Sequence, residues 1–312
     1  MARVNQGESG GPVMADRRVI VCPVDFSEPS RTALNYAAVI ADHFGARLLV
    51  VAIDDPLLAS AAENAGLPTL AHETKEELQR FVARTVPEGS ARAATVEFRV
   101  GVGKPAPEIL RIAHGAAAAL IVMSSHGRSG MSKHFFGSTT ERVLRETTIP
   151  ILVTPKDAQR VATVADISHR VHSVVAPVDL SASSAHQVRI ASEIAATLHV
   201  PLLLAHVLEP VFIPPRVRAA IPGADQARRG DVEAQLLNLA ESSGIRESVE
   251  ALVLSGDPSE EIVRLTDARG ASLVVMGLHS SVMLGQRMGA VTYRVLCLTR
   301  ALVLALPPDT QR

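Results

Sequence analysis

The sequence predicts an α/β protein of two repeated, doubly wound domains, each a five-stranded parallel sheet with helices on both faces. An internal repeat is the first reason, because Arg17–Ser30 ("RRVIVCPVDFSEPS") returns as His172–Ser184 ("HSVVAPVDLSASS"). The second reason is that short β-branched runs alternate with amphipathic stretches, which is typical of parallel strands joined by crossover helices. The length of 312 residues also suits two domains better than one.

In the first copy, five strands are expected to alternate with helices along the chain. The expected strands are residues 18–24, 46–53, 94–100, 119–124 and 150–154. The stretch 27–45 is expected to be the first helix, because its apolar residues fall on one helical face and it ends at Gly45. With right-handed crossovers, the ligand site of such a sheet lies outside the carboxyl ends of the strands, where the winding direction reverses.

The repeat extends over the whole chain. Asp25 falls on Asp179 at an offset of 154, Gly103 on Gly256 at 153 and Pro155 on Pro307 at 152. Such a nearly constant offset indicates two copies of one unit. The expected division is a disordered tail (1–16), a first domain (17–155), a polar linker (156–170) and a second domain (171–312). Because Met14 directly precedes the first strand, the protein's start is expected at either Met1 or Met14.

The composition argues against several classes of partner. A formal net charge of −1 and 3% aromatic residues provide little for binding phosphates or stacking bases, so no nucleic acid is expected. The longest apolar runs, such as Ala116–Met123, are far shorter than the roughly 20 residues of a membrane span, so no membrane association is expected. Cys22 and Cys297 are too isolated for a disulfide framework or a metal site. No apolar core of a signal peptide is present, which favours a cytoplasmic location.

The turn after the fourth expected strand is the first candidate site. It lies within Met123–Leu144 ("MSSHGRSGMSKHFFGSTTERVL"). The glycines of this stretch allow positive φ and a close approach of backbone N–H groups to a ligand. In "STTE", Ser138 is expected to cap the next helix while Glu141 reaches back to the cap. A helix N-terminus of this kind favours phosphate. The alternative is an ordinary glycine-rich turn, and the missing Gly-Lys-Ser or Gly-Lys-Thr argues against a P-loop.

Asp25 is the second candidate. It follows the first strand in "PVDFS", so it is expected at the carboxyl edge beside the same crevice. Its carboxylate could accept hydrogen bonds from an adenine amino group or from ribose hydroxyls. A helix N-cap is the alternative role, and both interpretations stay open at this point.

These motifs resemble those of the universal stress protein family, in a tandem arrangement. Its ATP-binding members carry Gly-x-x-Gly, nine residues and then Gly-Ser or Gly-Thr after the fourth strand, with an Asp at the end of the first. The first copy has Gly127, nine residues and Gly137-Ser138, although Ser124 replaces the first glycine. The second copy keeps Gly277 but has lost the second glycine, one spacer residue and the serine after Gly289.

The resemblance implies a Rossmann-like, adenine nucleotide alpha hydrolase-like fold that binds ATP in the first domain only. The second domain would be a structural or regulatory partner. Any Mg²⁺ would arrive with the nucleotide, because no carboxylate pair is placed to hold a metal, and no catalytic residue is expected. The implied nucleotide-binding residues are Pro23, Val24, Asp25, Val51, Ala52, Met123, Ser125, His126, Gly127, Arg128, Gly130, Gly137, Ser138 and Thr139.

Three functions compete. The resemblance favours a non-enzymatic, ATP-binding regulatory module of the stress response, whose protein partner is unknown. A weak ATP hydrolase is the second possibility, but the sequence offers no candidate base, arginine finger or metal-holding acids for it. A nucleotide-free oligomeric scaffold is favoured by Ser124 and by the altered second copy.

The last strands, "IPILVTP" and "ALVLALP", are expected to pair and cover each other's edges. The chain would then form an intrachain pseudo-dimer, and a further homodimer is an additional expectation.

Overall fold

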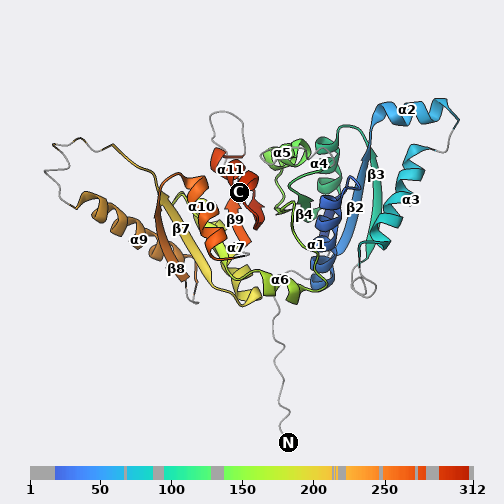
Figure 1. Ribbon diagram of the computed structural model, residues 1–312. Helices are drawn as coiled ribbons and strands as arrows, with labels where there is room; N and C mark the ends of the chain where they lie inside the picture. Colours follow the sequence, from blue (N-terminus) through green and yellow to red (C-terminus); the bar gives the residue numbers. More distant parts are fainter. Residues whose placement is uncertain are drawn as a thin grey trace, which may run out of the picture.

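The computed structural model has the predicted α/β architecture in two repeats (Figure 1). It describes residues 18–66, 69–86, 95–127, 137–212, 214, 216, 223–245, 249–270, 273–278 and 288–308. The elements of the first half are β1 (Val19–Pro23), α1 (Glu28–Phe44), β2 (Arg47–Asp54), α2 (Pro56–Asn64), α3 (Leu70–Ala83), β3 (Val96–Val102), α4 (Pro105–Gly115), β4 (Ala118–Ser124), α5 (Ser138–Glu146) and β5 (Ile151–Thr154).

The second half repeats this order after a connecting helix. Its elements are α6 (Val164–Arg170), β6 (Val174–Pro177), α7 (Ser184–Leu198), β7 (Leu202–Leu208), α9 (Ala224–Ser242), β8 (Val249–Ser255), α10 (Pro258–Ala268), β9 (Leu273–Gly277), α11 (Ala290–Leu298) and β10 (Leu302–Leu306). Among the described helices, none combines the length and apolar character needed to cross a bilayer.

The ten strands among the described residues form one sheet in the order β3-β2-β1-β4-β5-β10-β9-β6-β7-β8. Within each half the neighbouring strands are parallel. The chain winds outward from β1 in one direction through β2 and β3, and in the other through β4 and β5. The doubly wound prediction is therefore confirmed, and the switch points lie between β1 and β4 and between β6 and β9.

The two halves join through their last strands. Strand β10 pairs antiparallel with β5, with Leu304 opposite Leu152 and Val303 opposite Val153. This pairing confirms the expected intrachain contact and covers both apolar edges. Figure 1 shows the halves side by side, with α6 running between them at one end of the strands.

The sheet separates two apolar cores, each continuous across both halves. Helices α1, α3, α7 and α9 contribute to one core, and α4, α5, α10 and α11 to the other. Along β1, Ile20 and Cys22 face the first core while Val19 and Val21 face the second, as the two-residue period of a strand requires. Burial on both faces explains why the strands are continuous apolar runs.

Local sequence signals account for most element ends. Helix α1 is capped by the Ser27 hydroxyl, which accepts from the Ser30 N–H, and ends at Gly45 with φ of 59°. Two features differ from expectation: β2 and β3 are joined by two helices, α2 and α3, and the polar stretch expected as a linker contains α6. Helix α6 begins with a Thr163–Asp166 capping box and buries Ile167, and it is too short for its periodicity to stand out.

Candidate functional site

A cavity of about 550 Å³ opens at the carboxyl ends of β1, β2 and β4 in the first half. It lies at the switch point where ligands of doubly wound sheets bind. Ser125 is not among its lining residues, and Arg128 and Gly130 lie outside the described part of the chain. The predicted residues that line it are Pro23, Val24, Asp25, Val51, Ala52, Met123, His126, Gly127, Gly137, Ser138 and Thr139.

Asp25 lies between the start of α1 and the turn after β4. Its Oδ1 accepts from the Ser27 N–H at 3.1 Å and from the Ser27 hydroxyl at 2.5 Å. A Cβ atom at Gly127 would lie 2.6 Å from Asp25 Oδ2, so any side chain there would displace the Asp25 carboxylate from its present position. Ser27, not Asp25, is the N-cap of α1. Ser27 thus takes the N-cap role that the sequence had left open for Asp25.

The turn itself is stabilised by its own hydroxyl groups. Ser124, which stands where the family pattern has glycine, donates from its Oγ to the His126 carbonyl at 2.5 Å and lines the cavity. Ser125 is buried, and its hydroxyl pairs with His126 Nδ1 at 2.9 Å. The Ser125 carbonyl in turn accepts from the Gly137 N–H at 2.9 Å, which brings the two ends of the turn together.

Helix α5 begins at the cavity without a side-chain cap. Its N-cap is Gly137 and Ser138 is already helical, so the expected capping box is wrong, and Glu141 pairs with Arg145 instead. Gly137 has a φ of −61°, so positive φ is not why glycine stands there. A Cβ at Gly137 would lie 3.3 Å from the Ser125 carbonyl oxygen, which is a tight contact. An uncapped N-terminus presents its first N–H groups and the positive end of the helix dipole to a ligand.

Several residues at the β2 end of the cavity were not predicted. Asp54 ends β2, is 8% exposed and accepts from the Thr74 hydroxyl of α3 at 2.8 Å. The rule that selected Asp25 would have found Asp54, because both acids stand at the carboxyl ends of buried strands, whereas no sequence signal marks Thr74. Apolar side chains of Phe26, Leu58 and Leu70 line the same end.

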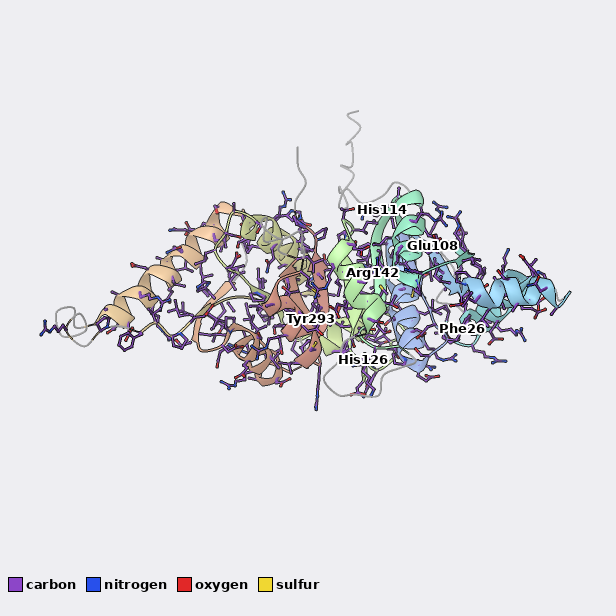
Figure 2. The ribbon with its side chains drawn as sticks, turned by 90° about the horizontal axis from the view of Figure 1, so that it is seen from above. Phe26, Glu108, His114, His126, Arg142 and Tyr293 are labelled. Atoms are coloured by element: carbon purple, nitrogen blue, oxygen red, sulfur yellow. The ribbon has the colours of Figure 1, made fainter. Side chains whose placement is uncertain are left out.

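Phe26 is held in a strained conformation beside the cavity. Its φ is 63°, which is uncommon for a residue other than glycine, and its ring meets Phe81 edge-to-face with centroids 5.5 Å apart. The Arg31 guanidinium lies 4.3 Å from the centre of the Phe81 ring. Figure 2 shows Phe26 and His126 in the first half of the molecule, and both line the cavity.

The groups around the cavity bear on its chemistry in three ways. Burial raises the pKa of the Cys22 thiol, so the cysteine next to Pro23 stays protonated and is a poor nucleophile. Among the residues that the structure describes, no group of three or more His, Cys, Asp or Glu could hold a metal ion. The cavity offers carboxylate acceptors, hydroxyl groups and a helix N-terminus.

Two positions of the second half hold larger side chains than their counterparts in the first half. At the offset of 154, Ala33 is replaced by Gln187 and Ala52 by His206. Gln187 is 3% exposed and donates from Nε2 to the carbonyls of Pro177 and Val275, at 2.8 and 2.9 Å.

His206 is the second of these larger side chains. Its Nδ1 lies 2.8 Å from the Val178 carbonyl. An amide and an imidazole therefore stand where the first half has two alanines.

Other parts of the site are kept in both halves. Thr140 and Thr292 both donate to a carbonyl at the end of the preceding strand, at 2.9 and 3.2 Å. Asp179 accepts from the Ser181 N–H and the Ser184 hydroxyl, at 2.9 and 3.1 Å. Leu180 repeats the positive φ of Phe26, with a value of 61°.

The model of the universal stress protein family matches residues 16–155 and 170–307. Universal stress protein MJ0531 of Methanocaldococcus jannaschii is 30% identical over 139 residues, which cover 44% of this chain and 81% of that protein. A universal stress protein of Thermus aquaticus, named for the QAH/OAS sulfhydrylase 3' region, is 32% identical over 140 residues, covering 44% of this chain and 97% of its own.

Two solved structures match both halves. A universal stress protein from Archaeoglobus fulgidus has a TM-score of 0.65 at 18% identity, covering 94% of this chain and 97% of that one. A putative universal stress protein from Pseudomonas aeruginosa has a TM-score of 0.64 at 17% identity, covering 95% of each chain. At such identities the structural likeness shows the fold, and the tandem arrangement is part of it.

Proposed function

Because the chain belongs to the universal stress protein family, we propose that it is an ATP-binding regulatory module that holds one adenine nucleotide in its first half. The second half holds none and acts as a structural or regulatory partner. The observation that carries this proposal is the difference between the two crevices. The first has a cavity of about 550 Å³ bordered by Asp25 and the uncapped α5, whereas the second half has His206 in place of the cavity-lining Ala52 and Gln187 in place of Ala33.

The residues of the cavity suit the parts of an adenine nucleotide. Phosphates, which are anionic, would lie at the N-terminus of α5, near Gly137, Ser138 and Thr139. Ribose hydroxyls would donate to Asp25, and adenine would lie against Val51 and Ala52 at the end of β2. A bound Mg²⁺ would come with the phosphates and neutralise part of their charge.

The position of α5 supports a regulatory role. Its side chains Glu141 and Arg145 act electrostatically on Tyr293 of α11, in the other half. Figure 2 places Tyr293 and Arg142 in the middle of the molecule, where the halves meet. Burial raises the pKa of Tyr293, and the Cys297 thiol and the Glu141 carboxylate raise it further. A phosphate at the N-terminus of α5 would thus add its charge beside side chains that interact with a helix of the second half.

The first experiment purifies the full chain without added nucleotide, identifies any co-purified ligand by mass spectrometry, and then titrates the nucleotide-free protein with Mg·ATP by calorimetry. We expect one ATP per chain, recovered intact after incubation. Release of ADP would favour the hydrolase, and absence of both co-purified nucleotide and binding heat would favour the nucleotide-free scaffold.

A further inference from the structure

We infer that Asp54 recognises the exocyclic amino group of the bound adenine, which makes it the residue that selects this base. The inference rests on the proposed nucleotide site. Its starting observation is that Asp54 Oδ2 is buried and has no hydrogen-bond partner among the described residues, although the side chain lines the cavity. A buried polar atom without a partner is costly, and a bound ligand that supplies the missing donor removes that cost.

The sheet order places Asp54 at the base end of the site. Strand β1 lies between β4 and β2, and neighbouring strands are about 4.8 Å apart, so β2 is roughly 10 Å from the strand that precedes α5. Phosphates at α5 and ribose at Asp25 on β1 therefore leave the base at β2. Asp54 follows Ala52 by two residues, so both side chains lie on the same face of the strand.

The surroundings of Asp54 fit a flat, apolar ring with one polar corner. Phe26, Leu58 and Leu70 supply apolar surface at this end of the cavity. The Thr74 hydroxyl already donates to Asp54 Oδ1, which fixes the carboxylate and leaves Oδ2 for the ligand. An ionised carboxylate only accepts hydrogen bonds, and the amino group on C6 of adenine is a donor.

The second half has lost this acceptor. Leu208 stands where the first half has Asp54, and it is 8% exposed. The change accompanies that of Ala52 to His206, so the copy has an imidazole in place of a small side chain and no carboxylate at the Asp54 position. The natural substitution at this position also supplies the test variant, Asp54→Leu.

The test compares ATP with purine riboside triphosphate, which lacks only the amino group, by calorimetry on the full chain. The wild-type protein should bind ATP about 10- to 100-fold more tightly, as expected for a hydrogen bond to a charged group. Asp54→Leu should reduce this ratio to near 1. Asp54→Asn, which keeps an uncharged acceptor, should give an intermediate ratio. Thermal melting of the nucleotide-free Asp54→Leu protein, which also loses the hydrogen bond from the Thr74 hydroxyl, checks that the variant is folded.

Two controls separate this role from others. Asp55→Asn changes the neighbouring carboxylate, which caps α2, and asparagine caps helices equally well, so the ratio should stay at its wild-type value. With 2′-deoxy-ATP as ligand, Asp54→Leu should lose the same factor as with ATP. A smaller loss with the deoxy nucleotide would assign Asp54 to ribose and overturn the inference.

Two further results would overturn the inference, and they differ in what they imply for the nucleotide site. If Asp54→Leu keeps the wild-type preference for ATP, the inference is wrong and the nucleotide site stands. If the wild-type chain binds no ATP, the nucleotide site and the inference are both wrong.

Discussion

The crevice beside β1 and the crevice beside β6 have the same backbone design and different contents. Both keep an aspartate after the strand, a residue with positive φ after it, and a threonine that ties the next helix to the strand before it. They differ at the positions of Ala33, Ala52 and Asp54, which become Gln187, His206 and Leu208. The first set of features holds the turns and helices of each half in place, so both halves need it. The second set gives the second half an amide, an imidazole and an apolar side chain where the first half has two alanines and a carboxylate.

Of the variants that compare the two crevices, those at the glycines preceding α5 and α11 are expected to differ most in ATP binding. Gly137→Val should abolish ATP binding to the full chain, because its Cβ would lie 3.3 Å from the Ser125 carbonyl and its methyl groups would enter the phosphate end of the cavity. Gly289→Val is the matched control. No described atom lies within 4 Å of a Cβ built there, so one ATP should still bind. Calorimetric stoichiometry distinguishes the variants, and loss of binding in Gly289→Val alone would reverse the assignment of the halves.

Exchange of single residues between the crevices should have the next largest effect. Ala52→His places the imidazole of the second half in the first cavity, where Ala52 is 2% exposed, and should weaken ATP binding by about 100-fold through lost space. His206→Ala should leave the stoichiometry at one, because the second half still lacks Asp54 and the full turn. Appearance of a second ATP in His206→Ala would show that the imidazole alone closes that crevice.

The aspartates after β1 and β6 test whether their shared role includes ligand binding. Asp25→Ala should weaken ATP binding by about 10- to 100-fold, the effect of losing a hydrogen bond to a charged group. Asp179→Ala should leave ATP binding unchanged. Both variants lose bonds at a helix start, so both should lower the free energy of unfolding by about 1 kcal/mol. Denaturant titration alongside calorimetry checks this, and equal ATP affinities in the two variants would assign Asp25 to structure alone.

The smallest effect concerns stability without binding. Gln187→Ala should lower the free energy of unfolding by about 2 kcal/mol, because the carbonyls of Pro177 and Val275 lose their buried donor. ATP affinity should not change, since the first half is untouched. Thermal melting with and without ATP measures both quantities. A stable Gln187→Ala variant would mean that other donors or water satisfy these carbonyls.

The site was only partly predictable from the sequence. The turn glycines, Asp25 and the strand ends were visible because turn residues and strand boundaries are local signals. Ser138 was expected as a cap, but Gly137 occupies that place and Ser138 is helical, since the close Ser125–Gly137 contact sets where the helix begins. That contact joins the two ends of the turn, and no local pattern reports it.

By itself, the sequence determined the repeat, the order of strands, the doubly wound topology and the pairing of the last strands. These features follow from periodic burial and edge protection. Both leave a pattern that extends over all the residues of a helix or strand. Only the tertiary structure decided that Thr74 fixes one oxygen of Asp54 and leaves the other facing the cavity, and that Gln187 bridges Pro177 and Val275. Such contacts join residues far apart in the chain, and their geometry depends on how helices pack against the sheet. The role of each of these side chains therefore becomes visible only when the chain is folded.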